Sequence, residues 1–313
     1  MKYNARSVLG RPRYFLTFCF VLFILISAVF AWWYIPTGVL VVYVFSDTDE
    51  LAIGNLHFFV HKAIQTDKMS QYAIIIQGDM KSSHLLPKLP RHARYVFHSN
   101  TCYDWGAIGW FLKSEAKNLR YKSYVFINSS VRGPFLPKYF SGRWVHIFTK
   151  QLNAEVKLVG PTISCEGSPL NGDVNSNWRR NPHVQSYALA TDQIGLKVLL
   201  KDDRVFKCHT NRWDTIYYSE IGASAAILDA GFNLDCLMVR YQGIDWRRHA
   251  NQECNGFRNP VGDAANDGLT IHPLEAVFVK YKQTLHIGET LSLQTAKKMS
   301  TWLGESDPSP SLI

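Results

Sequence analysis

Two polar segments of the chain each follow a short apolar run and carry side chains that could hold a sugar or a phosphate. In the first segment, residues 99–106 (SNTCYDWG), Asn100 and Asp104 could hydrogen-bond to ribose or sugar hydroxyls. Trp105 could stack on a ring of the same ligand. Aspartate is also a favoured helix N-cap, so a purely structural role for Asp104 is the alternative interpretation.

The second segment, residues 128–134 (NSSVRGP), begins where another apolar run ends. Asn128 and Ser129 offer small polar groups there, and Arg132 could grip a phosphate through its fork of N–H donors. The same residues form a glycosylation sequon, so a glycosylated surface Asn128 is the alternative. We favour a ligand pocket, because the sequon begins at the end of an apolar strand and not in an exposed loop.

A third polar segment, residues 182–187 (PHVQSY), has the alternation of a strand. That alternation places His183, Gln185 and Tyr187 on one face, which is polar for a core position. We therefore expect this face to line a cleft on the acceptor side of the ligand. A solvated strand face is the alternative.

Carboxylates that could remove a proton lie further along the chain. Glu220 is near the start of a predicted helix, where it could act as a general base or simply favour the helix N-terminus. Asp192 is the second candidate for the base, after Glu220. His272 could contact a diphosphate or a metal, although a lone histidine is more often structural, so we assign no metal ligand.

The elements that must position these residues alternate between strands and helices. In the first half of the chain this order predicts an α/β domain with a mainly parallel sheet, which binds ligands at the carboxyl ends of its strands. The predicted strands are residues 39–45, 72–77, 93–98 and 124–128, and the predicted helices are 51–64 and 104–119. The second half is less regular, with predicted strands at 155–159, 183–189 and 234–241, helices at 193–200 and 215–230, and a polar loop at 244–268.

The N-terminal region predicts a membrane anchor. Residues 15–35 hold no charge and are long enough to cross about 30 Å of hydrocarbon as a helix. Residues 1–14 carry four basic residues and no acid, so we expect them to stay in the cytosol. The prediction is a single-pass type II protein of the Golgi or endoplasmic-reticulum membrane, with a lumenal domain at 36–302 and a flexible tail at 303–313. A cleaved signal peptide is the alternative.

Composition limits the partners. The net charge is +9, but no run of lysines and arginines occurs, so we expect no nucleic-acid partner. A phosphate-bearing ligand or an anionic glycan would suit a mildly basic surface. Five of the six cysteines follow the predicted anchor, which predicts two disulfides and one remaining thiol without fixing their pairing.

The motifs occur in an order that resembles a known family. The segments NTCYDWG, YVFINSSVRGPFLP, VKLVGP, PHVQSYALATD, SEIG and HPLEAVFVK follow one another as in rhamnan-synthesis protein F and related glycosyltransferase-like proteins of algae and other eukaryotes. The resemblance spans residues 39–280. It implies a GT-A-like, Rossmann-like fold, and a hexosyl- or deoxyhexosyl-transferase that uses a nucleotide-sugar donor and a glycan acceptor.

The resemblance also implies a metal motif that this chain lacks. Such enzymes usually carry an Asp-x-Asp at the end of the fourth strand, which holds Mn²⁺ or Mg²⁺ beneath the donor diphosphate. Here Asn128, Ser129 and Ser130 occupy the matching place. Asp47 and Asp49 form an Asp-x-Asp after the first strand, a position that contacts the nucleotide in the GT-A layout. Either the reaction runs without metal, or the metal lies elsewhere, or the domain is catalytically silent.

Together these observations predict a glycosyltransferase of the secretory pathway. The alternative is a silent lumenal module of the same fold that binds a glycan or a partner enzyme. A glycosidase also stays an alternative, because its chemistry needs only two carboxylates. The expected donor-binding residues are Asp47, Asn100, Asp104, Trp105, Asn128, Ser129 and Arg132; the acceptor-binding residues are His183, Gln185 and Tyr187; the catalytic candidates are Glu220 and Asp192.

Overall fold

The computed structural model describes residues 38–47, 49–78, 83–115, 121–248, 251–282 and 290–304. The predicted cytosolic tail, the predicted anchor at 15–35 and all but two residues of the predicted flexible tail lie outside these ranges. Within them, no helix is both long enough and apolar enough to cross a membrane.

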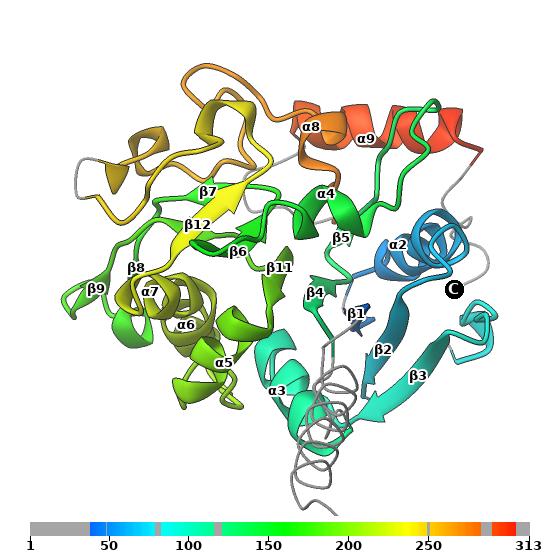
Figure 1. Ribbon diagram of the computed structural model, residues 1–313, viewed down its shortest axis with the longest axis horizontal. Helices are drawn as coiled ribbons and strands as arrows, with labels where there is room; N and C mark the ends of the chain where they lie inside the picture. The colour runs from blue at the N-terminus through cyan, green and yellow to red at the C-terminus, as the bar shows by residue number, and fades with distance from the viewer. Residues whose placement is uncertain are drawn as a thin grey trace, which may run out of the picture. The chain divides into compact units, whose positions relative to one another are not determined.

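A seven-stranded, mainly parallel sheet forms the centre of the described region (Figure 1), which confirms the predicted α/β class. The strand order is β12-β6-β11-β4-β1-β2-β3, and β11 alone runs antiparallel to its two neighbours. The strands are β1 (Val39–Phe45), β2 (Gln71–Gln77), β3 (Ala93–His98), β4 (Ser123–Asn128), β6 (Val156–Gly160), β11 (Ala188–Asp192) and β12 (Asn233–Cys236).

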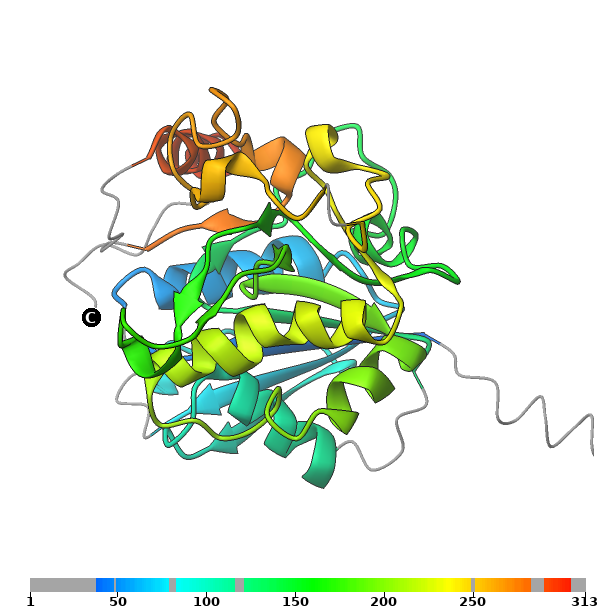
Figure 2. The ribbon, with the colours of Figure 1, turned by 90° about the vertical axis from the view of Figure 1, so that its left-hand side faces the viewer.

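Helices cover both faces of this sheet, as its composition requires. Strands β1, β2 and β4 are apolar at nearly every position, so neither of their faces can be left in water. Figures 1 and 2 show α3, α5 and α7 on one face and α2 and α4 on the other. These helices are α2 (Ala52–Phe59), α3 (Asp104–Ser114), α4 (Val145–Thr149), α5 (Gln193–Lys201) and α7 (Ile221–Asp229).

The second half of the chain differs from the prediction in at least three places. The predicted strand at 234–241 ends at Cys236, and Val239–Tyr241 form a 3₁₀ helix. The predicted strand at 183–189 is two elements: β10 (His183–Val184) pairs with β7 (Ile163–Ser164), and the chain then enters β11. The predicted helix at 215–230 begins with a π-helical segment, η4 (Thr215–Glu220), before α7. The predicted C-cap is confirmed: Gly231 follows α7 with a φ of 82°, which glycine adopts at no steric cost.

Short elements complete the described part of the chain. One small pair matters for the site, because β5 (Val131–Arg132) pairs antiparallel with β13 (Val279–Lys280). The others are η1 (Val60–Ile64), η2 (Ser83–Leu85), β8 (Ser168–Pro169), η3 (Leu170–Gly172), β9 (Trp178–Arg179), α6 (Arg212–Asp214), η5 (Val239–Tyr241), η7 (Asn255–Phe257), α8 (Pro273–Ala276) and α9 (Leu291–Trp302).

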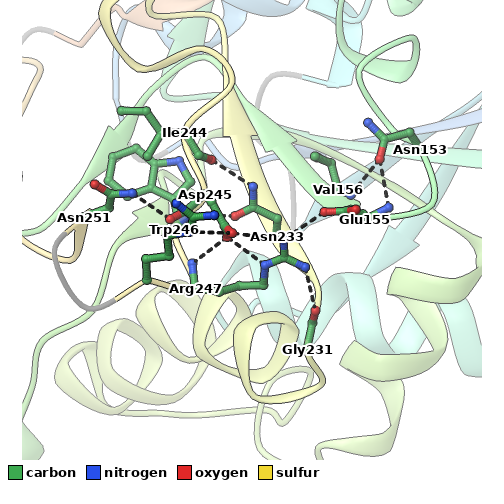
Figure 3. Close-up of polar contacts among 11 residues, drawn as sticks. Asn153, Glu155, Val156, Gly231, Asn233, Ile244, Asp245, Trp246, Arg247 and Asn251 are labelled. Carbon is green, nitrogen blue, oxygen red and sulfur yellow. Dashed lines mark hydrogen bonds and ion pairs between the residues drawn. The ribbon is translucent and has the colours of Figure 1, made fainter.

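The predicted polar loop after residue 244 is fastened to the edge of the sheet by side-chain hydrogen bonds (Figure 3). Buried Asn233, on the edge strand β12, donates to the carbonyl of Ile244 at 2.8 Å and accepts from the backbone N–H of Trp246 at 2.9 Å. Arg247 donates to Glu155 at 2.8 Å and to Asp245 at 2.7 Å. These polar contacts fix the start of the loop. The loop also buries Trp246, Cys254, Val261 and Ala265, which the prediction of few core positions did not include.

Two disulfides join distant parts of the domain. Cys102 is bonded to Cys208, and Cys165 to Cys254, while Cys236 is a buried free thiol. This confirms the predicted number of pairs and supplies the pairing that the sequence left open. The first disulfide ties the loop after β3 to the segment that leads into α6.

Candidate functional site

A polar cavity of about 520 Å³ opens at the carboxyl ends of β1, β2, β3 and β4. In the strand order, β2 and β3 lie on one side of β1 and β4 lies on the other. Open α/β sheets form a ligand crevice where the strand order reverses in this way. The cavity is lined by Ser46, Asp49, Gln77, Asn100, Thr101, Cys102, Tyr103, Asp104, Asn128, Ser129, Ser130, Ser186, Thr210, Glu220, Lys280 and Lys282.

The two polar segments that opened the sequence analysis converge on this cavity. Asp104 begins α3, which follows β3, and Asn128 ends β4. The Asn128 side-chain amide donates to the Asp104 carboxylate at 2.7 Å. Gln77, at the end of β2, donates to the carbonyl of Cys102 at 2.7 Å and so holds the loop between β3 and α3 in place. The segments therefore share one concave surface.

A chain of hydrogen bonds crosses the cavity from an acid to a base. Asn128 donates to Asp104 through Nδ2 and accepts from the Ser130 hydroxyl through Oδ1. Ser130 Oγ in turn accepts a hydrogen bond from Lys280 Nζ at 2.8 Å. Both ends of the Asn128 side-chain amide are therefore hydrogen-bonded within the cavity. This position does not fit the alternative of a glycosylated surface asparagine.

Buried contacts beneath the cavity hold Lys280 in position. Its strand, β13, pairs with β5, directly after the loop that carries Ser130. The backbone N–H of Tyr281 donates to the Ser130 carbonyl at 3.0 Å. Asn55 of α2, which is 1% exposed, donates to the carbonyls of both Ser129 and Tyr281 at 2.9 Å. The segments that carry Ser130 and Lys280 are thus joined by strand pairing and by the hydrogen bonds of Asn55.

Burial shifts the pKa values of the two charged groups at the ends of this chain. Burial raises the pKa of Asp104 to about 6, against the lowering effects of the Asn128 hydrogen bond and of Lys280. Burial lowers the pKa of Lys280 to about 8, although Glu220 and Asp104 favour its charged form. Perturbed pKa values in a cleft are typical of functional sites.

Five of the predicted site residues line the cavity: Asn100, Asp104, Asn128, Ser129 and Glu220. Three of the predicted donor contacts, Asp47, Trp105 and Arg132, lie outside it. Asp47 is exposed and absent from the lining, where its neighbour Asp49 is found instead. Trp105 is 4% exposed and packs on Phe206 in the core, so it cannot stack on a ligand.

Arg132 also lies outside the cavity, because β5 turns its side chain toward α2 and α9. The guanidinium is 2% exposed, donates to Asn55 Oδ1 at 2.9 Å and lies 3.7 Å from the centre of the Tyr281 ring. It contacts residues that hold Lys280 and does not reach a ligand. The predicted phosphate-binding role is therefore not retained for this side chain.

The three predicted acceptor-side residues do not line the cavity. His183 and Tyr187 are buried, and the Tyr187 hydroxyl hydrogen-bonds to Thr162 Oγ1. Gln185 bonds to Thr162 and Asn259. Ser186 is the residue of this segment that faces the cavity. The predicted strand is broken between β10 and β11, so a single alternation does not run through all of these residues.

Asp192 and His272 are helix caps. Asp192 accepts from the backbone N–H of Gly195 at 2.8 Å and pairs with Lys157 at 2.6 Å. It lies beside Ser123, the first residue of β4, and thus at the edge of the sheet opposite the cavity. His272 caps α8 by accepting from the N–H of Leu274 at 3.1 Å.

The residues at the end of β4 do not fit a divalent cation. Mg²⁺ is usually held by one or two carboxylates together with waters and substrate phosphates, and Asn128, Ser129 and Ser130 supply no carboxylate. No group of three or more His, Cys, Asp or Glu side chains that could hold a metal occurs in the ranges described. At the matching position, the Lys280 ammonium donates to Ser130. We therefore derive no step through a metal.

Several lining residues were missed in the sequence. Ser130 and Tyr103 lie within segments that were singled out, but no role was assigned to either. Lys280 ends the apolar run 276–279, and a lysine at the end of a buried strand is the signal that could have drawn attention to it. Lys282 follows two residues later without a comparable signal.

Comparisons with known proteins identify no family for this chain. No protein-family model and no curated protein matches the chain. Among solved structures, 4-diphosphocytidyl-2C-methyl-D-erythritol synthase from Anaerococcus prevotii DSM 20548 has 11% identity and a TM-score of 0.39, with 69% of this chain and 95% of that one covered. HddC from Yersinia pseudotuberculosis has 8% identity and a TM-score of 0.31, with 57% and 83% covered. Likeness at these scores supports no conclusion about this chain.

Proposed function

We propose that the chain is a glycosyltransferase that moves a sugar from a nucleoside-diphosphate sugar to a glycan or glycoprotein acceptor. The observation that carries this proposal is the convergence of residues 99–104 and 128–130 on one polar cavity at the switch point of a parallel sheet. The order of motifs, which resembles GT-A-type glycosyltransferases, supplies the reaction class.

The donor would lie across the ends of β1, β3 and β4. Asp104 and Asn100 would accept hydrogen bonds from ribose or sugar hydroxyls, because both line the cavity, and Asp104 contacts the Asn128 amide there. Asn128 and Ser129 would lie nearest the diphosphate. Holding the donor in this way lowers the barrier by positioning before any chemistry occurs.

Glu220 is the proposed general base for transfer with inversion. The acceptor oxygen would form a bond to the anomeric carbon while the bond from that carbon to the diphosphate oxygen breaks. The electron pair of the broken bond leaves with the nucleoside diphosphate, and the acceptor proton passes to the Glu220 carboxylate. Glu220 lines the cavity, whereas Asp192 lies at the opposite end of the strands, beside the first residue of β4.

A donor screen tests the proposed activity. The purified full-length chain in detergent is incubated with UDP-, GDP- and dTDP-sugars, with and without manganese, and release of nucleoside diphosphate is measured. Turnover of one donor class supports the transferase, with slow donor hydrolysis expected when no acceptor is present. Thermal stabilisation by glycans but by no nucleotide would overturn it in favour of the silent binding module, which the absence of an Asp-x-Asp at the end of β4 favours.

We also propose that this domain faces the lumen of the Golgi or endoplasmic reticulum, behind the predicted type II anchor. Two disulfides in the domain are typical of an oxidising compartment. The uncharged run at 15–35 and the basic residues before it support the orientation. Protease treatment of sealed microsomes tests this: a C-terminal tag should be protected until detergent is added, and immediate digestion would contradict the orientation.

A further inference from the structure

We propose that Lys280, with Lys282 beside it, binds the diphosphate of the donor in place of a divalent cation, so that the site binds nucleoside diphosphates without metal. This inference rests on the proposed function and adds the identity of the group that neutralises the leaving phosphate. It reassigns to Lys280 the role that the sequence suggested for Arg132.

The first support is the position of the ammonium. Lys280 and Lys282 both line the cavity, and Lys280 Nζ donates to Ser130 Oγ at the end of β4. That strand end is where the family pattern implies a metal beneath the diphosphate. A cation therefore already lies where the charge is needed, although it comes from the chain itself.

The second support is that this cation is not neutralised by an ion pair. Among the described residues, Lys280 forms no ion pair, and its side chain has one hydrogen bond, to the Ser130 hydroxyl. An ammonium carries three N–H donors, so two remain for a ligand. The charged groups that act on it are Asp104 from α3, Glu220 from η4, Arg212 from α6 and its neighbour Lys282.

The third support is that strand pairing, backbone hydrogen bonds and ring contacts hold the segment that carries the ammonium. Strand β13 pairs with β5, and Tyr281 is bonded to both Ser130 and Asn55 through its backbone. The Arg132 guanidinium lies under the Tyr281 ring. The Lys280 side chain also lies against the Tyr187 ring, 5.2 Å from its centre. A preorganised cation stabilises developing charge without having to move during the reaction.

The chemical role follows from the charge balance of the transfer. When the bond between the anomeric carbon and the diphosphate oxygen breaks, the electron pair stays on that oxygen and its negative charge grows. Hydrogen bonds donated by Lys280 would strengthen as this charge develops. No proton needs to leave the lysine, because nucleoside diphosphate is already a stable leaving group.

Titration calorimetry of UDP and GDP into the full-length chain tests the inference. Measurements in EDTA and in manganese should give equal affinities for the nucleotide that binds. Lys280→Met should weaken binding about 10- to 100-fold in EDTA, as loss of a charged hydrogen bond implies, while Lys280→Arg retains most of it. Lys113→Met, at an exposed position on α3, is the matched control and should leave the affinity unchanged.

The pH dependence provides a second readout that needs no loss-of-charge variant. Because the pKa of Lys280 is lowered to about 8, nucleotide affinity of the wild-type protein should fall as pH rises through that value. The Lys280→Arg variant should lose this decline, since arginine stays charged. A decline that is identical in both proteins would overturn the role of Lys280.

The outcomes separate this inference from the proposed function. Binding that requires manganese and is unaffected by Lys280→Met overturns the inference while the transferase survives. Binding of neither nucleotide under any condition, together with no turnover in the donor screen, overturns both. Equal binding in EDTA and manganese that depends on Lys280 supports both.

Discussion

The side-chain amide of Asn128 donates a hydrogen bond to the carboxylate of Asp104 across 2.7 Å. One residue ends β4 and the other begins α3, 24 positions earlier in the chain. This contact joins the two polar segments into one surface, and burial raises the pKa of Asp104 to about 6. The proposed function depends on this junction.

Replacing Asp104 with asparagine separates a ligand-binding role from a structural one. The carboxamide oxygen of Asp104→Asn can still accept from Asn128, so the melting temperature should stay nearly unchanged. Transfer should fall by about 10- to 100-fold, because a charged acceptor for the donor hydroxyls is lost. Steady-state kinetics and thermal melts measure the two effects. Asp203→Asn, at an exposed site, is the control, and a large loss of stability in Asp104→Asn would mark a structural cap.

Glu220→Gln should impair chemistry and spare donor binding. A positioned general base contributes about 10²- to 10⁴-fold, so kcat should fall by that order. Nucleotide affinity measured by calorimetry should remain within about twofold, a change worth less than 1 kcal/mol. If kcat were unchanged, Glu220 would be a lining residue without a catalytic role, and the proton would have to pass to another acceptor.

The first four strands and the position of the cavity were predictable from the sequence, because apolar β-branched runs set the strands and parallel strands present their carboxyl ends at one edge. That is why Asp104 and Asn128 could be placed together. Lys280 could not be found in this way, since it reaches the cavity through β13, which pairs with β5 some 150 residues away in the chain.

The errors also have physical causes. Asp192 ends a strand, as Asn128 does, but β11 runs antiparallel to β4, so the carboxyl end of β11 lies beside the amino end of β4, away from the cavity. Arg132 follows β4 closely, yet β5 turns it into the core against Asn55. The prediction that Tyr187 faces the cavity was wrong, because the strand breaks into two elements and the alternation of side chains does not continue across the break. Strand direction and breaks depend on distant pairing, which a local pattern does not contain.

Asp67→Asn should destabilise the fold by about 3–5 kcal/mol, because it leaves the partly buried Arg143 without its carboxylate. Asp67 is 1% exposed and accepts from Arg143 Nε and Ser70 Oγ, each at 2.7 Å. Urea unfolding measures the loss. Glu115→Gln is the control, since its pair with Arg94 is exposed and worth at most about 1 kcal/mol. Equal losses in the two variants would contradict this account.

The same carboxylate predicts how stability responds to acid. Burial alone would raise the pKa of Asp67, but hydrogen bonds from Arg143 and Ser70 outweigh burial and hold that pKa below 3.8. Its contribution is therefore complete above the unfolded pKa of about 3.9 and is lost as pH falls through the lower native value. Unfolding free energies measured from pH 5 downward should fall less steeply in Asp67→Asn. Parallel curves would contradict this assignment.

Gly109→Ala tests the close contact between α3 and the segment before Cys208. A Cβ at this position would lie 2.4 Å from the backbone oxygen of Phe206, so the helix or the loop must shift. We expect a loss of about 1–3 kcal/mol in the free energy of unfolding. Gly262→Ala is the matched control, because its Cβ would meet neighbours at 3.4 Å or more. Thermal melts in which both variants equal the wild type would contradict the packing.

A crystal structure of the full-length chain with the nucleoside diphosphate selected by the donor screen, grown in EDTA, tests the central claim most directly. We predict density for the nucleotide in the cavity, with a phosphate oxygen in hydrogen-bond range of Lys280 Nζ and a ribose hydroxyl at Asp104. Density for the nucleotide at any other place, or an empty cavity at saturating nucleotide, would contradict the account.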